Sequence, residues 1–332
     1  MKILFRVDAG GTVGLGHFYR SVNLAQQLKQ RGHDVYFSHL NSSFWNETTE
    51  KEFEFKCFTL DHQNSELQTL EIISQNNIEI YYVDGFIDFN KNFINQLKGK
   101  VKIIFYQNIC ESRKYADIFI LPSIHQGSDF FQVFNSQTKV FSGLKYFIFN
   151  PVLYNMDHKK NIIPEVSNVG IAAGGSDPKN SLIILYDHIA QLDYKNIEFT
   201  FYYGQDYLYK QSIPKEHPNN IHFKLFDHSE IIKNEILITA FGVSTYEFLY
   251  LGIPILSFGH QESNAFASTQ LALKTNSLIS LGEISKLSKQ KLDDALKTIL
   301  DYSVRKEITK KAQQILDLKG TERVIEIIEI EK

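Results

Sequence analysis

Cysteine is scarce in this sequence. Only Cys57 and Cys110 occur, far apart and without a C-x-x-C pattern. This scarcity argues against a disulfide scaffold and against a structural zinc site, and it fits a reducing cytoplasm. No stretch approaches the ~20 apolar residues of a membrane helix. The apolar run Ile3-Leu4-Phe5 after Met1-Lys2 is too short for a signal-peptide core. We therefore expect a cytoplasmic protein without a transmembrane segment.

An excess of positive charge is also missing. The 35 Lys and Arg residues face 38 Asp and Glu residues, which gives a formal net charge of -3. A nucleic-acid binder would show a basic stripe, so no nucleic-acid partner is expected. Charged residues make up 22% and hydrophobic residues 43% of the 332 residues, the balance of a folded protein rather than a disordered one. This length suffices for two domains, each with its own core.

Short apolar segments alternate with helical patterns along the chain. Such alternation implies βαβ units and a parallel sheet. The predicted helices cover a segment with Val22, Leu24, Ala25 and Leu28 on one side, then 180–192, 286–300, 304–318 and 322–330. The predicted strands are 3–7, 35–38, 78–83, 101–106, 118–121, 169–173, 198–203, 222–226, 236–239 and 255–258.

The polar segment 150–164 carries a Met-Asp-His-Lys-Lys run between two prolines. It predicts a linker, with a surface loop as the alternative. We therefore expect an α/β protein with two Rossmann-like parallel-sheet domains, residues 1–152 and 165–318, and a C-terminal helix within 319–332. Two such domains facing each other make a cleft. Ligands of open parallel sheets bind outside the carboxyl ends of the strands, so the loops at those ends are the candidate site.

The first of these loops, residues 8–20, joins the first strand to the first helix. Its glycines, Gly14 and Gly16 among them, let backbone N–H groups approach a ligand. No Gly-Lys-Ser/Thr closes it, so it is not a P-loop. Tyr19 occupies the third glycine position of a dinucleotide fingerprint, so that motif is poor as well. His17, at the helix start, suits a general base, because imidazole titrates near neutrality. A purely structural histidine is the alternative.

The second loop contains Gly174, Gly175, Ser176 and Asp177 between a strand and a helix. Its N–H groups and the Ser176 hydroxyl are candidates to hold phosphate oxygens. Asp177 is alternatively a cap of the following helix.

The third loop contains Gly242, Ser244, Thr245 and Glu247. Ser244 and Thr245 are candidates to cap a helix and donate to a phosphate, and Glu247 to accept hydrogen bonds from both hydroxyls of a ribose. The alternative is a plain capping box, with Ser244 as the cap and Glu247 three residues later. Both assignments are compatible.

Polar residues after other strands complete the candidates. His260 and Gln261 follow one strand of the second half. Asp84 ends a buried strand of the first half, where it either satisfies local backbone donors or touches substrate. The sequence shows no metal-ligand cluster, so we expect no metal and no other cofactor.

The motifs form an ordered set over nearly the whole chain: Asp8…Gly14-x-Gly16-His17-x-x-Arg20, Gly143-Leu144-Lys145-Tyr146, Gly174-Gly175-Ser176-Asp177-Pro178, and Gly242-x-Ser244-Thr245-x-Glu247…Gly252-x-Pro254. This set resembles the nucleotide-sugar hydrolases of pseudaminic acid biosynthesis, grouped with spore-coat polysaccharide proteins. More distantly it resembles the peptidoglycan N-acetylglucosaminyltransferase. The resemblance implies the GT-B fold and the release of UDP from UDP-2,4-diacetamido-2,4,6-trideoxy-β-L-altrose.

The resemblance also implies roles for matching positions. His17 falls on the family's catalytic histidine, which activates the attacking water. The loops at Gly174 and Ser244 fall on the diphosphate contacts, and Glu247 on the ribose contact. The last helix is expected to cross back onto the N-terminal domain.

Three positions on the sugar side depart from the family. Gly85-Phe86-Ile87 follows Asp84 where Asp-His-Tyr-Gly is usual. Gln107-Asn108 stands where an Asp-Asp pair is common, and His260-Gln261 replaces an Asn-Gln pair. The nucleotide side matches better, so the sequence predicts a nucleotide more firmly than it predicts the sugar. It determines neither the sugar, nor the base, nor the oligomeric state.

We therefore predict an inverting UDP-sugar hydrolase, in which His17 deprotonates water while the second-domain loops stabilise the departing UDP. A GT-B glycosyltransferase with an acceptor hydroxyl in place of water is the main alternative, and a nucleotide-sugar sensor or inactive scaffold is the third. The candidate binding residues are Asp8, Gly14, Gly16, Arg20, Asp84, Gly174, Gly175, Ser176, Gly242, Ser244, Thr245, Glu247, His260 and Gln261.

Overall fold

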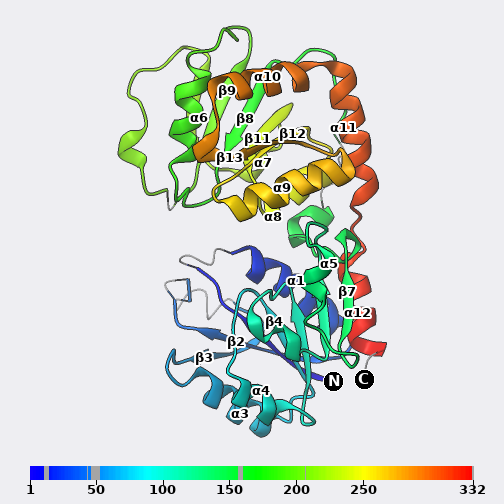
Figure 1. The fold of residues 1–332 in the computed structure, drawn as a ribbon. Coiled ribbons are helices and arrows are strands. Elements are labelled where there is room, and N and C mark those ends of the chain that lie inside the picture. The colour runs from blue at the N-terminus through cyan, green and yellow to red at the C-terminus, as the bar shows by residue number, and fades with distance from the viewer. Residues whose placement is uncertain (11–14, 43, 46–52, 156–159, 206, 331–332) are drawn as a thin grey trace. The chain divides into compact units, whose positions relative to one another are not determined.

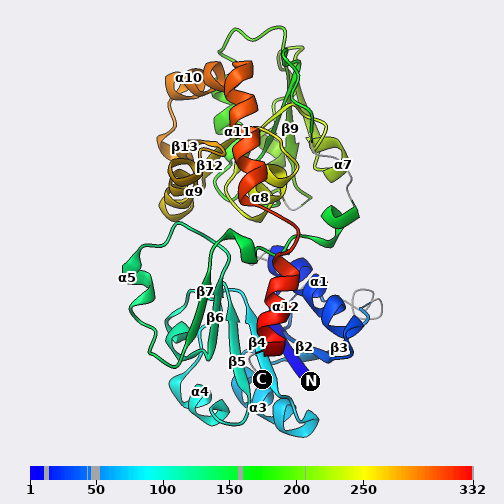
Figure 2. The ribbon, with the colours of Figure 1, turned by 90° about the vertical axis from the view of Figure 1, so that its right-hand side faces the viewer.

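The computed structural model describes residues 1–10, 15–42, 44–45, 53–155, 160–205 and 207–330. Contacts within the chain divide it into two compact units. Unit 1 comprises Met1–Met156 and Leu318–Lys332, and unit 2 comprises Asp157–Asp317. Both units are built from parallel strands with helices on the two faces of the sheet (Figures 1 and 2).

Within the described part of unit 1, seven parallel strands form one sheet in the order β3-β2-β1-β4-β5-β6-β7. The strands are β1 (Lys2–Val7), β2 (Asp34–Leu40), β3 (Lys56–Leu60), β4 (Ile80–Asp84), β5 (Lys102–Tyr106), β6 (Ile118–Leu121) and β7 (Lys139–Ser142). The helices are α1 (Gly16–Gln30), α3 (Ser65–Asn76), α4 (Lys91–Leu97), α5 (Ser128–Phe131) and α12 (Gly320–Ile330), with 3-10 turns η1 (Glu111–Tyr115), η2 (Leu144–Tyr146) and η3 (Pro151–Asn155).

Alternate residues of β1 pack on opposite faces of this sheet. Ile3, Phe5 and Val7 belong to a core with α1 and α12, whereas Leu4 belongs to a core with α3 and α4. Successive side chains of a strand point to opposite faces, so two helical layers bury both sides. Because the helices cover the two faces, it is loops that lie at the carboxyl ends of the central strands.

Within the described part of unit 2, six parallel strands follow the order β10-β9-β8-β11-β12-β13. The strands are β8 (Asn168–Ala172), β9 (Glu198–Tyr203), β10 (Ile221–Leu225), β11 (Ile236–Ala240), β12 (Ile255–Gly259) and β13 (Ile279–Glu283). The helices are α6 (Ser181–Ile189), α7 (His228–Ile231), α8 (Val243–Tyr250), α9 (Glu262–Thr275), α10 (Lys289–Leu300) and α11 (Tyr302–Ile315), with 3-10 turns η4 (Lys210–Ser212) and η5 (Ile284–Lys286).

The parallel α/β architecture predicted from the sequence is confirmed. Every predicted strand is present, with ends shifted by no more than two residues. The strands that the sequence did not predict are β3, β7 and β13, and all three lie at sheet edges. These three strands are partly exposed and lack the continuous apolar run that marks a strand buried on both faces.

The Gly143–Tyr146 motif lies where α12 packs within unit 1. Arg323 of α12 donates to the Lys145 carbonyl at 2.8 Å. A Cβ on Gly320 would lie 1.9 Å from the Phe147 carbonyl oxygen, so only glycine fits this approach. Figure 2 shows α12, in red, running beside α1. The motif therefore has a packing role in unit 1.

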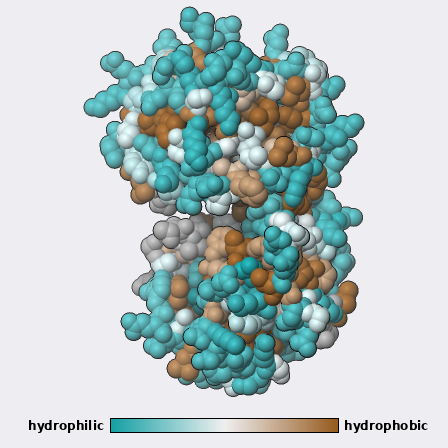
Figure 3. Space-filling view, viewed as in Figure 1, coloured by the Kyte–Doolittle hydropathy of each residue, from teal (hydrophilic) through white to brown (hydrophobic). Residues whose placement is uncertain are grey.

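Hydrophilic side chains predominate on the face seen in Figure 3, on both units, with smaller hydrophobic patches among them. In the part of the chain that the structure describes, no helix is long and apolar enough to cross a membrane.

Candidate functional site

His17 lies in the first turn of α1, and 12% of its side chain is exposed. Its Nδ1 is 2.8 Å from Oδ1 of Asp84, the last residue of β4. The parallel pairing of β1 with β4 sets Val7 beside Asp84. The loop that leaves β1 and the end of β4 therefore meet at one edge of the sheet, and the fold brings this histidine to a carboxylate from a distant part of the sequence.

Arg20 joins the pair from one turn further along α1. Its Nε donates to Asp84 Oδ2 at 2.7 Å, its Nη2 donates to Asp84 Oδ1, and its Nη1 donates to Gln107 Oε1 at 2.5 Å. The Ser21 hydroxyl also donates to Asp84 Oδ2, at 2.9 Å. The Tyr106 ring lies against the guanidinium, 4.8 Å from its centroid. The side chains of Arg20 and Asp84 are 1% and 0% exposed, so this is a buried ion pair.

The pair keeps Asp84 ionised. Burial by itself raises the pKa of a carboxyl group, but the charge and hydrogen bonds of Arg20 and the hydrogen bond of His17 outweigh it. The pKa of Asp84 therefore lies below its ordinary value. At neutral pH the His17 ring faces a fixed negative charge.

The proton of the neutral His17 ring belongs on Nδ1. Arg20 Nη2 lies 2.6 Å from the same nitrogen, so two arrangements compete. With the proton on Nδ1, the Oδ1 atom of Asp84 accepts from both His17 Nδ1 and Arg20 Nη2, which lie next to each other. With the proton on Nε2, Nδ1 of His17 would accept from Arg20 Nη2. Its lone pair would then face a lone pair of Asp84 Oδ1 across 2.8 Å. We assign the first arrangement, which leaves the Nε2 lone pair available to take a proton.

Gly85 and Phe86 wall the other side of this ring. Gly85 has φ +119°, a conformation that glycine adopts freely. The Phe86 ring meets the His17 ring edge-on at 5.5 Å between centroids, and 58% of Phe86 is exposed. The residues that depart from the expected Asp-His-Tyr-Gly thus make an aromatic wall beside His17.

The other candidate residues of unit 1 do not all lie beside His17. Arg20 was predicted as a ligand contact, and Asp84, at the end of β4, as either a ligand contact or a partner of local donors; both are buried, and they bind each other beneath His17. Asp8 lies apart from His17: its Oδ2 accepts from Arg6 at 3.0 Å and its Oδ1 from the Leu40 N–H at 2.8 Å. Gly16 begins α1. Gly14 lies outside the described residues.

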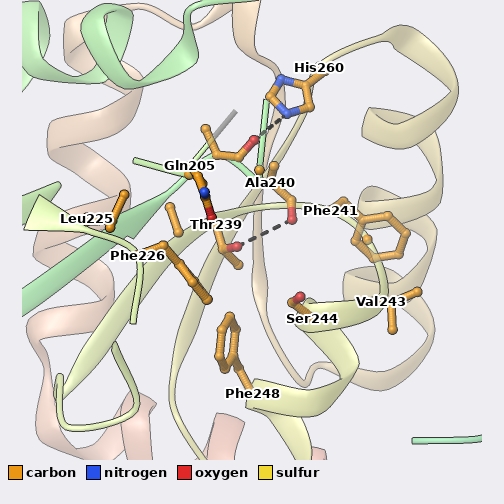
Figure 4. A pocket seen from close by; sticks show the side chains of 16 residues that line it. Gln205, Leu225, Phe226, Thr239, Ala240, Phe241, Val243, Ser244, Phe248 and His260 are labelled. Atoms are coloured by element: carbon orange, nitrogen blue, oxygen red, sulfur yellow. Dashed lines mark hydrogen bonds between the residues drawn. The ribbon is translucent and has the colours of Figure 1, made fainter. Parts of the chain in front are cut away.

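Unit 2 contains a cavity of about 540 Å³ at the carboxyl ends of β8, β9, β10 and β11 (Figure 4). The first strand of this unit, β8, has β9 on one side and β11 on the other, so the cavity lies where the strand order reverses. The described lining includes no Lys, Arg, Asp or Glu. It consists of Ala172, Ala173, Gly174, Gly175, Gly204, Gln205, Leu225, Phe226, Thr239, Ala240, Phe241, Gly242, Val243, Ser244, Phe248 and His260.

This lining combines polar groups with aromatic rings. Ser244, in the first turn of α8, borders the cavity together with Gly174 and Gly175. The first N–H groups of a helix have no intrahelical partner, and with the helix dipole they favour an anion. Phe226 and Phe248 lie at the end away from His260 in Figure 4 and offer apolar surface for a ring. The cavity therefore fits a molecule with an anionic group and a flat ring.

The capping of α8 differs from the prediction. The N-cap is Gly242, not Ser244, because the helix begins at Val243, two residues earlier than a Ser244 cap would place it. The Thr245 hydroxyl accepts from the Gly242 N–H at 3.1 Å and donates to the Ala240 carbonyl at 3.2 Å. Thr245 therefore stabilises the turn between β11 and α8 through these two hydrogen bonds. Ser244 is left exposed at the cavity, so the capping box with Ser244 as its cap was wrong.

The Gly174–Asn180 loop carries its own cap. The N-cap residue of α6 is Asn180, but the Asp177 carboxylate accepts from the N–H groups of Ser181 at 2.8 Å and Leu182 at 3.0 Å, so Asp177 has the function of a cap. This carboxylate occupies the N-terminus of α6 and would repel a phosphate there. The glycine backbone remains at the cavity, whereas Ser176 is exposed outside its lining.

His260 ties two loops together. Its Nε2 donates to the Ala173 carbonyl at 2.9 Å (Figure 4), so its Nδ1 can accept from the Ser181 hydroxyl, also at 2.9 Å. The carbonyl can only accept, which fixes the tautomer of a neutral ring. His260 therefore anchors the glycine loop as well as lining the cavity.

Some predicted residues lie away from this cavity, and some of its lining was not predicted. Glu247 is buried in α8, and Gln261 is an exposed residue at the start of α9. Phe226 and Phe248 were missed, although Phe226 ends a predicted strand and so carried a signal. Among the described residues, no three His, Cys, Asp or Glu side chains are grouped as a metal site would require.

No protein-family model matches the chain. An uncharacterized protein of Methanocaldococcus jannaschii, MJ1062, is 26% identical over 274 residues, which cover 77% of this chain and 55% of that protein. The chain thus spans about half the length of this relative. The spore coat polysaccharide biosynthesis protein SpsG of Bacillus subtilis is 22% identical over 99% of this chain and 98% of its own length.

Several solved structures resemble the whole chain, including the two that follow. MurG of Acinetobacter baumannii has a TM-score of 0.71 at 15% identity, over 99% of both chains. MnaA of Staphylococcus aureus, solved with UDP, has a TM-score of 0.69 at 15% identity, over 99% of this chain and 96% of its own. These likenesses show the fold: the protein consists of two Rossmann-like parallel-sheet domains of the GT-B type.

Proposed function

We propose that the protein is a nucleotide-sugar hydrolase that breaks the anomeric C–O bond and releases UDP. The hydrogen bond between His17 and the buried Asp84 carries the proposal. It fixes the proton on Nδ1 and leaves Nε2 as a base, with a carboxylate behind it to stabilise the imidazolium that forms.

The cavity of unit 2 supplies the nucleotide part of the proposal. Its glycine loop and the first turn of α8 offer N–H groups for a diphosphate, and Ser244 offers a hydroxyl. Phe226 and Phe248 offer apolar surface for the base. A relative named for polysaccharide biosynthesis and a neighbour solved with UDP agree with this assignment. Uridine rests on the resemblance of the motifs and on that neighbour.

In the proposed reaction, His17 Nε2 takes a proton from water while the water oxygen attacks the anomeric carbon. The bond between that carbon and the diphosphate oxygen breaks, and its electron pair leaves with UDP. Backbone N–H groups at the cavity stabilise the charge that develops on the leaving oxygen. Attack opposite the leaving group gives inversion. The sugar that we propose is a 2,4-diacetamido-2,4,6-trideoxyhexose, the substrate that the resemblance implies.

The test is a panel of UDP-sugars incubated with the wild type and with His17→Ala, with NMR of the released sugar reporting its identity and stereochemistry. We expect release of UDP without any acceptor, reduced roughly 10²–10⁴-fold in the variant. UDP affinity, measured by calorimetry, should be unchanged. Normal turnover of His17→Ala would remove its role as the base.

Glycosyl transfer is the second candidate, since His17 serves an acceptor hydroxyl as well as it serves water and a MurG structure is among the neighbours. Slow UDP release that accelerates only when a hydroxyl acceptor is added would favour transfer. Tight UDP binding without turnover on the whole panel would favour a sensor or scaffold.

A further inference from the structure

Unit 1 contains a second cavity, of about 530 Å³, that no part of the proposed hydrolysis uses. It lies at the carboxyl ends of β1 and β2, with the β3–α3 loop and the segment after β4 as its other walls. The lining comprises Arg6, Asp8, Leu40, residues 62–67 and residues 86–89. This position, outside the carboxyl ends of parallel strands, is where open α/β sheets bind ligands.

The cavity opens on the α3 side of the sheet, whereas His17 belongs to α1 on the other side. Arg6 follows Leu4 at the strand period of two, and Leu4 packs with α3 and α4. The two places share one wall, because the exposed ring of Phe86 lines the cavity and also contacts His17.

Three carboxylates, those of Asp8, Glu66 and Asp88, lie in the polar lining, which also includes Arg6 and the polar residues 62–65. The guanidinium of Arg6, 3% exposed, binds Asp8 with Nε at 3.1 Å and Nη2 at 3.0 Å, so its charge is already neutralised. One oxygen of Glu66 accepts from the Asn90 N–H at 2.7 Å, and one oxygen of Asp88 accepts from the Ser112 N–H at 2.8 Å. An ionised carboxylate has about four lone-pair sites, so each keeps acceptor capacity after these bonds.

Negative charge in surplus disfavours a phosphate or a carboxylate ligand. Burial acts to raise the pKa of Asp88, but the hydrogen bonds of Ser112 and Phe89 outweigh it, so this group stays ionised at neutral pH. Fixed acceptors favour a ligand rich in O–H or N–H donors. The exposed side chains of Phe86 and Leu67 at the same cavity offer apolar surface for the C–H face of a ring.

We propose that this cavity is a carbohydrate-binding site, distinct from the nucleotide cavity of unit 2. A pyranose ring places its hydroxyls on Asp88, Glu66 and Asp8 and its C–H face on Phe86. Arg6 is a positioning residue, since it orients Asp8 from below. The proposal needs only a pyranose, whatever its source, and so does not depend on the hydrolysis proposed above.

The experiment is saturation-transfer NMR on the full chain with N-acetyl-D-glucosamine and methyl β-D-glucopyranoside as probes, and with inorganic phosphate as an anionic competitor. We expect saturation transfer from the protein to the ring protons of the sugar probe, and we expect added phosphate not to reduce it. Asp88→Asn and Phe86→Ala should each weaken binding about tenfold or more, as for loss of a hydrogen bond to a charged group or of a stacking face. Glu111→Gln, an exposed carboxylate of unit 1 outside the cavity, should bind as the wild type does.

UDP titration of the same variants separates the two proposals. Unchanged UDP affinity with lost sugar binding would support a separate carbohydrate site. Equal sugar binding by Asp88→Asn, Phe86→Ala and Glu111→Gln, no saturation transfer to either probe, or displacement by phosphate would each overturn it. None of these results bears on whether His17 catalyses hydrolysis.

Discussion

Replacing Asp84 by asparagine should destabilise unit 1 and abolish most of the activity, although the side chain keeps its size. The change removes the negative charge that accepts from Arg20, Ser21 and His17. It leaves the Arg20 guanidinium 1% exposed without its counter-charge. Breaking a buried pair by removing one partner costs about 3–5 kcal/mol.

For a unit of this size, each kcal/mol shifts the melting temperature by about 2–4 °C, so a loss of roughly 6–20 °C is expected. The matched control is Glu329→Gln in the same unit. Glu329 binds Arg31 and His33 at 2.9 and 3.0 Å, but at a partly exposed site. Such pairs are worth about 0–1 kcal/mol, so the control should melt within a few degrees of the wild type.

Differential scanning calorimetry measures both variants, and the double variant Asp84→Asn/Arg20→Met tests the cause. Removing both charges should restore much of the stability while leaving turnover roughly 10²–10⁴-fold low, because His17 has still lost its orienting carboxylate. If Asp84→Asn melted no lower than Glu329→Gln, the buried ion pair would not be what holds this edge of the sheet.

The same pair predicts a pH dependence. Because the pKa of folded Asp84 is lowered, the unfolded state binds its proton first as the solution is acidified. Its stabilisation is fully present above the unfolded pKa of about 3.9 and is lost as pH falls through the lower folded value. Urea unfolding between pH 3 and 7 should therefore show a smaller acid loss in Asp84→Asn than in the wild type.

Two further changes test unit 2. In Gly204→Ala the new Cβ would lie 2.0 Å from the Gly175 carbonyl oxygen, so the glycine loop should shift and UDP affinity should fall about tenfold or more; Gly127→Ala, with nothing within 4 Å, is the control. An unchanged affinity would exclude this loop from the nucleotide site. Arg305→Met should cost about 3 kcal/mol in urea unfolding, because buried Arg305 donates to the carbonyls of Ile163, Pro164, Ile299 and Leu300; Lys310→Met, at an exposed position of the same helix, should cost nothing measurable. Equal unfolding of both variants would contradict a structural role for Arg305.

Local sequence determined the strands and the turns. The apolar runs at 3–7, 78–83 and 236–239 predict strands because parallel strands buried on both faces read as continuous hydrophobic segments. Strand β7 was not predicted, since its largely exposed residues lack that signal. A capping role for Asp177 was one of the two roles predicted from the sequence; it could be recognised there because the N–H groups that Asp177 binds lie only four and five residues further on.

The tertiary structure decided which candidate residues meet. From the sequence, Asp8, Arg20 and Asp84 were all candidate binding residues, with local hydrogen bonding as the alternative for Asp84. Strand pairing instead buries Arg20 and Asp84 beneath His17. Asp8 lies at another cavity, because it follows the two-residue period of β1 and accepts from the Leu40 N–H. A sequence states which residues follow a strand, but contacts between distant segments depend on how the strands pair and which face each side chain takes.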